Sequence, residues 1–399
     1  MSKTLITSLG KGVYETDGYR LTTYRFNNGK EFETSLILTA ILDNDPDITD
    51  VFIVGTTTSG WDMLMANNLD DNWVKVKEEC ESDSGLQPES HELIINALRA
   101  RYESVKFTIK PHTPVIGRDT IESVFNTYLD TAREVKKDTQ LMLDITHGFR
   151  SMPLLIWQAL QLLSESFAEV SILYGEHSPV DKISYIRDLS AYWSLSEIIK
   201  AQYSFINNLD GFALSKHIET CWGQGAKAIQ SFSEIVAANF ALQVPGVLKQ
   251  INNALNELPD DAPRWVCEVA KFLTDIYERL SGKETRHEQI FEYALLLAER
   301  KLYTQAVIAQ QIAVEVFIAG DDGGDYEWWL DCGRELYNKK KKNMPSKYKE
   351  ALSRLEGLRN QIAHGGAKSK RGGGGMPAAV NIEPTLKRTT PAVLELFKY

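Results

Sequence analysis

A ten-residue stretch from Asp144 to Pro153 gathers more polar chemistry than a turn requires. Its candidate ligand-binding residues are Thr146, His147, Gly148 and Arg150. The apolar run before it predicts a buried strand, and Gly148 permits the turn into a following helix. Amide groups at a helix start attract anions, and a histidine and an arginine beside them strengthen that attraction. The stretch therefore predicts an anion site, while Asp144 also fits a structural role, as a helix cap or as the partner of His147.

Two further loops follow predicted strands at the same edge of a sheet, where ligands bind in open α/β folds. They are Ser8–Tyr14 and Gly55–Trp61. Their candidate ligand-binding residues are Gly10 and Lys11 in the first loop and Thr57 and Ser59 in the second. Glycine allows close backbone approach, lysine and the hydroxyl groups suit phosphate or ribose oxygens, and Trp61 suits stacking on a base. A tight hairpin explains the first loop equally well, and a helix N-cap explains the second.

Near the end of the chain, Arg359 and His364 share one predicted helix. The apolar stripe of that helix places Arg359 roughly 60° and His364 roughly 160° from its centre, so His364 is not a core histidine. The two residues are about 7.5 Å apart along the helix axis, close enough to share one phosphate. The arginine would steady a scissile phosphate, and the histidine would exchange protons with a 2′-hydroxyl nucleophile or a leaving 5′-oxygen, with no metal. A histidine that only favours the helix dipole is the alternative.

The 399 residues suit two domains, and the chain changes character near residue 190. Over residues 1–190, β-rich runs alternate with helical patterns, which predicts a Rossmann-like α/β domain. Residues 191–399 show helical periodicity without a convincing strand, which predicts an all-α domain. No flexible linker marks the join, so we expect the two domains to communicate mechanically.

Hydrophobic periodicity predicts the individual elements. The expected strands are Thr4–Leu9, Leu21–Phe26, Asp50–Gly55, Val105–Ile109, Leu141–Ile145, Val170–Tyr174 and Ile183–Arg187. The expected helices are Glu31–Leu42, Ser90–Arg101, Thr120–Val135, Pro153–Ser166, Leu195–Leu209, Phe212–Trp222, Ala226–Glu257, Trp265–Leu280, Gln289–Ile318 and Ser346–His364. Pro245 should break or kink its helix, and the four glycines at 372–375 predict a mobile loop.

The composition of the chain limits the kinds of partner that it can bind. The net charge of −10 excludes a general nucleic-acid coat, so any RNA contact must use a local basic region. Two such regions exist, around Lys339–Lys342 and Lys368–Arg371, and a solvated loop is the alternative reading of each. Apolar runs are too short for a membrane span, and no signal peptide precedes them, which predicts a cytoplasmic protein. Four scattered cysteines predict neither a zinc site nor a disulfide framework.

The stretch at 144–153 closely resembles the signature of CARF domains in CRISPR-associated Csx-type proteins, and Ser8–Tyr14 resembles the first-strand motif of that family. In that family the domain is a Rossmann-like homodimer, whose two facing pockets bind a cyclic oligoadenylate made by a type III CRISPR complex. The resemblance implies cyclic tetra-adenylate as the first choice of activator, with rings of six or three behind it. It implies as ligand residues Gly10, Lys11, Thr57, Ser59, Thr146, His147, Gly148 and Arg150.

The segment Arg359–His364 resembles the R-x-x-x-x-H motif of HEPN ribonucleases, because it ends a long helix in an all-α domain behind a CARF-like domain. Asn360 follows the arginine, as is usual in that family. The resemblance implies catalytic roles for Arg359, Asn360 and His364. It also implies a composite site formed by two copies, which cleaves single-stranded RNA to leave a 2′,3′-cyclic phosphate and a 5′-hydroxyl.

The sequence therefore predicts a homodimeric or larger ribonuclease that cyclic oligoadenylate activates. Two other functions remain open, a ring nuclease that degrades the cyclic oligoadenylate and a non-catalytic regulator that senses a nucleotide. The intact R-x-x-x-x-H motif argues against the ring nuclease, and the net charge argues against a DNA-binding regulator. The lack of G-x-G-x-x-G makes a dinucleotide-dependent enzyme remote.

Overall fold

The computed structural model describes residues 2–12, 14–15, 18–66, 69–114, 117–148, 152–320, 332–363 and 378–398. The chain divides into two compact units, Met1–Leu195 and Ser196–Tyr399. The helix α6 (Ser190–Asn208) begins in the first unit and ends in the second. We describe each unit by itself.

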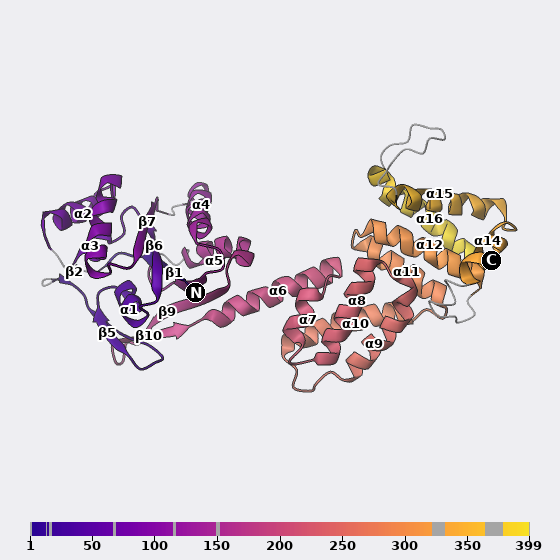
Figure 1. Ribbon diagram of the computed structural model, residues 1–399, viewed down its shortest axis with the longest axis horizontal. Coiled ribbons are helices and arrows are strands. Elements are labelled where there is room, and N and C mark those ends of the chain that lie inside the picture. Colours follow the sequence, from indigo (N-terminus) through magenta and orange to yellow (C-terminus); the bar gives the residue numbers. More distant parts are fainter. Residues whose placement is uncertain are drawn as a thin grey trace. The chain divides into compact units, whose positions relative to one another are not determined.

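The first unit is built on an eight-stranded sheet with the order β5-β4-β10-β9-β8-β1-β6-β7 (Figure 1). The strands are β1 (Lys3–Leu9), β4 (Thr22–Arg25), β5 (Glu31–Thr34), β6 (Ile48–Thr56), β7 (Lys106–His112), β8 (Gln140–Asp144), β9 (Glu169–His177) and β10 (Ile183–Asp188). The five strands from β9 to β7 are parallel, while β10 is antiparallel to β9, and β5 is antiparallel to β4. A separate short hairpin joins β2 (Tyr14–Glu15) and β3 (Gly18–Tyr19).

Helices cover both faces of this sheet. They are α1 (Ile37–Asn44), α2 (Asp71–Glu81), α3 (His91–Arg101), α4 (Arg118–Glu134) and α5 (Met152–Leu162), with short 3₁₀ turns η1 (Trp61–Met65), η2 (Pro88–Ser90) and η3 (Ser164–Ser166). Consecutive residues of a strand point to opposite faces, so Leu5 of β1 packs in the core with α1–α3, and Ile6 packs in the core with α4 and α5. Both side chains are fully buried, as a sheet covered on both faces requires.

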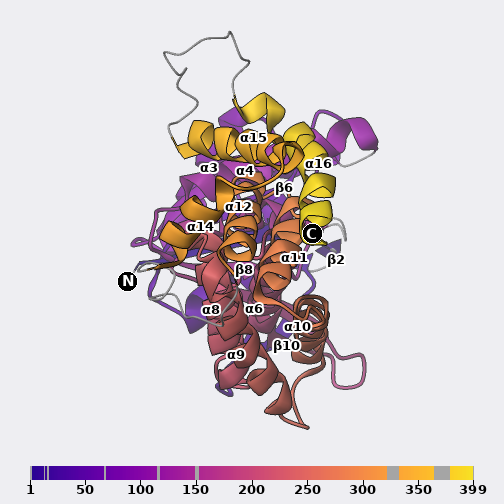
Figure 2. The same cartoon turned by 90° about the vertical axis from the view of Figure 1, so that its right-hand side faces the viewer.

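The second unit is helical throughout its described residues. After α6 it contains α7 (Phe212–Ile218), α8 (Gly223–Ala238), η4 (Ala241–Gln243), α9 (Val244–Asn256), α10 (Arg264–Ser281), α11 (Arg286–Glu299), α12 (Tyr303–Ala319), α14 (Arg334–Lys341), α15 (Ser346–Ala363) and α16 (Ala378–Leu396). The helix α12 contacts α11, α14, α15 and α16 (Figure 2). It carries apolar residues on nearly every side, which is typical of a central buried helix.

All seven expected strands are confirmed, and the α/β-then-all-α order is confirmed. Two expected helices are wrong in part. Residues 31–34 form β5, because they pair with β4, and the helix begins only at Ile37. The expected helix Gln289–Ile318 is two helices, because Lys301 adopts a left-handed conformation with φ of 60°.

Other differences are smaller. The expected helix Ala226–Glu257 is broken, but ahead of Pro245: α8 ends at Ala238, and its C-cap Asn239 is left-handed. The proline lies in the first turn of α9, where no N–H is needed. The sequence did not identify α2, α14 or α16. None of the helices in the described ranges has the length and apolar character that a bilayer span requires.

Candidate functional site

A cavity of about 180 Å³ lies beside the loop that follows β1, at the carboxyl edge of the parallel strands. It is lined by Leu9, Gly10, Lys11, Gly12, Arg20, Thr22, Tyr24, Ser35, Leu36, Met63 and His147. Lys11 and Arg20 are exposed cations at its rim, and the first turn of α1 begins beside it at Leu36. Two cations and a helix start favour an anionic ligand. The structure therefore brings together Gly10, Lys11 and His147, three of the candidate ligand-binding residues.

Residues of β4 and its flanking turns complete the cavity, and sequence analysis missed them. Tyr24 is only 2% exposed, and its hydroxyl lies 3.2 Å from Nε2 of His147. Burial raises the pKa of Tyr24 far above its ordinary value, so it stays a neutral phenol. Ser35 and Leu36 could not be recognised from the sequence, because the expected helix began at Glu31, whereas α1 begins at Ile37.

His147 is a neutral base in this setting. Burial lowers its pKa below the ordinary value, and the negative charge of Asp144 offsets part of that effect. A ligand phosphate beside the imidazole would favour the protonated form, so the ring is suited to taking up a proton when an anion binds.

Asp144 holds the loop that carries His147. Its side chain is fully buried, and its two carboxylate oxygens accept hydrogen bonds from Thr7 Oγ1 at 2.6 Å and from the backbone N of Thr146 at 2.9 Å. Thr7 and Asp144 are the last residue pair where β1 runs beside β8. Asp144 therefore has the structural role that the sequence left open, although its contacts are with Thr7 and Thr146.

Thr146 and Gly148 also shape this loop. The hydroxyl of Thr146 accepts a hydrogen bond from the backbone N of Gly175 at 2.8 Å, which ties the loop to β9. Gly148 has a φ of +105°, a conformation that favours glycine. A methyl group on Gly10 would lie 3.1 Å from the backbone N of Gly148, so the β1 and β8 loops pack with little space between them.

The loop Gly55–Trp61 has a different role from the one expected. The hydroxyl of Ser59 is buried, where it donates to the carbonyl of Leu9 and accepts from the backbone N of Thr56, both at 2.9 Å. Thr57 engages His112 and Leu86 through its backbone. Trp61 is fully buried, with its indole N–H bound to the carbonyl of Thr56, so the expected stacking of Trp61 on a base is wrong. Neither Thr57 nor Ser59 lines the cavity.

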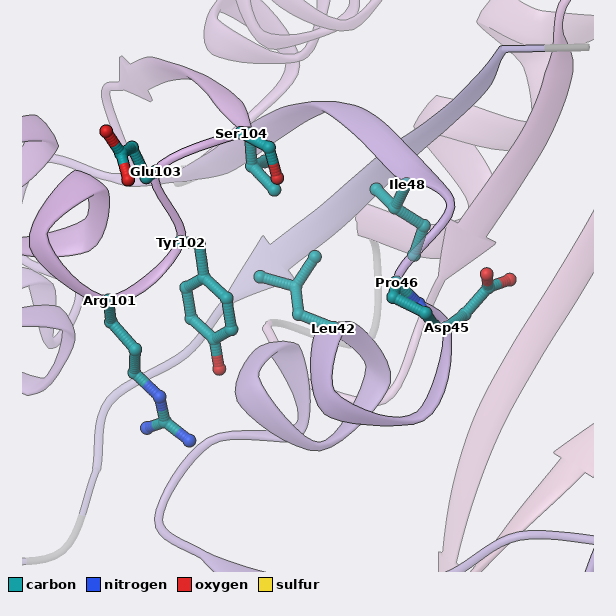
Figure 3. Close-up of a pocket in the computed structure, with 9 residues that line it drawn as sticks. Leu42, Asp45, Pro46, Ile48, Arg101, Tyr102, Glu103 and Ser104 are labelled. Atoms are coloured by element: carbon teal, nitrogen blue, oxygen red, sulfur yellow. The ribbon is translucent and has the colours of Figure 1, made fainter.

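A second hollow of about 400 Å³ lies at the opposite edge of the sheet, near the starts of β6 and β7. Figure 3 shows Arg101 and Tyr102 on one side of it and Leu42, Pro46 and Ile48 on the other. Both Arg101 and Tyr102 bond to Asp43, so their polar groups are already engaged. The amino edge of the strands is not where such folds bind ligands, and we assign the site to the smaller cavity.

In the second unit, α15 carries the other candidate residues. Its apolar stripe is buried as expected, with Leu355 fully covered, while Arg359 is half-buried and Asn360 is exposed. Arg359 donates from Nε to Oε1 of Gln311 at 3.2 Å and from Nη1 to Oδ1 of Asn360 at 3.1 Å. The structure therefore brings Arg359 and Asn360 together near the end of α15. His364 and Arg150 lie outside the described residues, as do the basic stretch 368–371 and the glycines at 372–375.

The lysines near residue 340 belong largely to a helix. Lys340 donates to the carbonyl of Ala319 at 2.7 Å, Lys341 pairs with Glu356, and Lys349 donates to the carbonyl of Lys342. Lys339 and Lys342 remain exposed. Within the described residues, no three His, Cys, Asp or Glu side chains form a cluster that could hold a metal ion.

Replacement of Asp144 by asparagine should destabilise the chain. The amide has one oxygen, so either Thr7 Oγ1 or the N of Thr146 loses its acceptor, and we expect the free energy of unfolding to fall by about 1–3 kcal/mol. Urea unfolding of the full chain, followed by tryptophan fluorescence, measures this loss. Asp130→Asn on the exposed surface of α4 is the matched control and should change the value by less than about 0.5 kcal/mol. An Asp144→Asn chain as stable as the control would show that this carboxylate does not hold the loop.

Comparisons with known proteins show what the chain is similar to. Residues 4–179 match the family model described as the CARF domain of the CRISPR system endoribonuclease Csx1. CRISPR-associated protein MJ1674 of Methanocaldococcus jannaschii is 22% identical over 93% of this chain, which spans 63% of that relative's length.

Among solved structures, Csm6 of Enterococcus italicus bound to cyclic hexa-2′-fluoro-hexa-dAMP matches all of this chain and 94% of its own, at 10% identity and a TM-score of 0.35. That overlap is too loose to support an argument on function. The family match over residues 4–179 includes every residue that lines the carboxyl-edge cavity. Residues 4–179 are therefore similar to the CARF domain of the CRISPR system endoribonuclease Csx1.

Proposed function

We propose that this chain is a CRISPR-associated, single-stranded RNA endoribonuclease that a cyclic oligoadenylate activates. The observation that carries the proposal is the presence, on one chain, of a CARF domain with a cation-lined cavity and a helical unit in which Arg359 and Asn360 meet at the end of α15. The first would sense the activator, and the second would contribute the nuclease site as an HEPN-like domain, completed by His364.

The cavity suits part of a larger ligand. Lys11 and Arg20 offer charge to phosphates, and His147 with Thr22 and Ser35 offers hydrogen bonds to ribose or base. Its volume of about 180 Å³ is below the roughly 300–1,000 Å³ of a typical small-molecule pocket, so one copy can hold only part of a ring. We therefore propose that two copies share one ring, with cyclic tetra-adenylate as the first candidate. Thr57 and Ser59 are not part of this proposed contact, because neither lines the cavity.

An exposed apolar face supports pairing of two copies. On α6, Tyr192, Leu195, Ile199 and Tyr203 recur at helical spacing, and each is at least 44% exposed. An apolar stripe of this kind on a helix typically packs against a partner. We propose that a second copy covers it, which gives a homodimer.

The proposed cleavage uses the 2′-hydroxyl of the RNA itself. Its oxygen attacks the adjacent phosphorus while the bond from phosphorus to the 5′-oxygen breaks, leaving a 2′,3′-cyclic phosphate and a 5′-hydroxyl. His364 would take the proton of the 2′-hydroxyl or supply one to the leaving oxygen, and Arg359 would stabilise the charge on the phosphate. Asn360 binds the arginine and helps to fix its position.

Activation requires that the ring bind one arrangement of the dimer more tightly than another. The ring can shift that equilibrium only by its difference in affinity for the two arrangements. Because α6 belongs to both units, it is the segment through which we propose that the shift passes.

Purified protein should cleave a fluorescent single-stranded RNA in EDTA only when cyclic tetra-, hexa- or tri-adenylate is added. Arg359→Ala and His364→Ala should each lower the cleavage rate by at least about a hundredfold, because each removes a group that acts on the phosphate or its protons. Gel analysis of the products and their end groups measures this. If the RNA stays intact while the cyclic oligoadenylate is degraded, the protein is a ring nuclease. If both stay intact, the protein is a non-catalytic nucleotide-sensing regulator.

Lys11→Ala should weaken binding of cyclic tetra-adenylate by about tenfold or more, since it removes a charge-assisted contact worth about 1.4 kcal/mol or more. Isothermal titration calorimetry at fixed salt measures the change. Lys137→Ala is the matched control, because Lys137 is exposed just before β8 and so lies at the other end of that strand. Equal affinities for the two variants would remove Lys11 from the site.

The affinity for the ring should rise as the pH falls from about 8 to about 6. His147 is neutral in the free protein because burial lowers its pKa, and a bound phosphate raises that pKa, so binding takes up a proton. The gain in affinity begins as the pH falls through the pKa of His147 in the bound protein, and it levels off below the pKa of His147 in the free protein. Calorimetry in buffers of different ionisation enthalpy counts the proton. A His147→Gln variant with the same pH dependence would assign the effect to another group.

A further inference from the structure

The guanidinium of Arg359 is held by a side chain from another helix. Gln311, on α12, is only 3% exposed, and its Oε1 accepts the hydrogen bond from Nε of Arg359 at 3.2 Å. The Nε2 of the same amide donates to Oε1 of Glu315 at 2.6 Å, one helical turn further along α12. A chain of three side chains therefore runs from Glu315 through Gln311 to Arg359.

The order of this chain fixes the direction of the amide. A carboxylate only accepts hydrogen bonds and an arginine only donates them, so the NH₂ group of Gln311 must face Glu315 and its oxygen must face Arg359. An amide without Glu315 could rotate by half a turn, which would place its NH₂ group against the guanidinium. Glu315 therefore decides which group Gln311 presents.

Charge supports the same arrangement. Glu315 is half-buried on a helix whose other residues are mostly apolar, and burial raises its pKa. The hydrogen bond from Gln311 and the charges of Arg359 and Arg334 oppose this effect and favour the carboxylate, whereas the negative charge of Glu356 adds to the rise. Arg359 thus receives a hydrogen bond acceptor from Gln311 and a negative charge from Glu315, both supplied by α12.

Two of the three guanidinium nitrogens thus bind protein groups, and the third is available to a ligand. Nε binds Gln311, and Nη1 binds Asn360, whereas Nη2 has no hydrogen-bond partner in the part of the chain that the structure describes. A planar guanidinium anchored at two nitrogens cannot rotate freely, so its remaining N–H groups keep one direction. Such preorganisation matters most when charge develops on a phosphate.

We propose that Gln311 and Glu315 are positioning residues of the nuclease site, in which Glu315 orients Gln311 and Gln311 holds the Arg359 guanidinium for the scissile phosphate. This inference rests on the ribonuclease proposed above. Neither residue touches the RNA in this account, since both act through Arg359.

A neighbouring glutamine provides a matched control. Gln310 is 1% exposed and also lies on α12, but it bonds to Thr389 and Thr390 of α16 and not to Arg359. Methionine at either position removes a buried amide of similar size. Both variants should therefore lose similar stability, while only the change at Gln311 frees the arginine.

The test is the ring-activated cleavage of RNA at saturating activator, with kcat and KM measured separately. Gln311→Met should lower kcat by about ten- to a hundredfold with KM changed less than about threefold, because the arginine is misplaced in the transition state. Glu315→Gln, which keeps the shape but no longer fixes the amide, should lower kcat by a smaller factor. Gln310→Met should keep kcat within about threefold of the wild type.

The outcomes separate the two proposals. If the wild type cleaves RNA, Arg359→Ala is inactive and Gln311→Met behaves like Gln310→Met, the ribonuclease stands and the positioning role is wrong. A rise in KM for Gln311→Met with kcat unchanged would also overturn the positioning role, because it would show that the residue affects only RNA binding. If the wild type cleaves no RNA with any ring, the proposed function fails and this inference fails with it.

Discussion

The buried carboxylate of Asp144 makes the contacts on which the geometry of the α/β unit depends. It joins the ends of two neighbouring parallel strands by binding Thr7 of β1 and the backbone that follows β8. Its cost in desolvation is offset only because both oxygens have donors. Since Thr146 and His147 follow it directly, the same contact that closes the strand ends sets where the imidazole lies. Stability and ligand chemistry therefore meet in one side chain.

The helical unit uses a comparable device in a different setting. The helix α12 is apolar almost all round. Two of its polar residues bind other helices, since Gln310 binds α16 and Gln311 binds α15, while Glu315 accepts a hydrogen bond from Gln311 within α12. Buried amides are tolerated only with matched partners, so they specify which helices pack and in which register. Arg359 is half-buried because it completes one of these pairs. The proposed catalytic arginine is thus also part of the packing of the helical unit.

The sequence predicted seven of the eight strands of the sheet, because their β-branched, apolar runs are unambiguous, but it read β5 as the start of a helix. It predicted the Asp144–Gly148 loop because the polar residues are contiguous. It could not predict Tyr24, Ser35 or Gln311 as site residues, since only the folded topology brings β4, α1 and α12 to these places. Ser59 and Trp61 misled, because hydroxyl and indole groups that satisfy a buried turn look the same in sequence as groups that bind a ligand. Lys301 gave no warning of a helix end, because lysine is a good helix former that here adopts a left-handed conformation.

The separation of the two cores in the α/β unit has a consequence for sequence variation. Leu9, Leu36 and Met63 line the cavity and also belong to the core that packs α1–α3, whereas the core of α4 and α5 shares no residue with it. Mutations that alter the cavity wall therefore act on one side of the sheet, and the packing on the other side is left intact. The wall of the cavity can therefore change in sequence while the α4–α5 side keeps its structure.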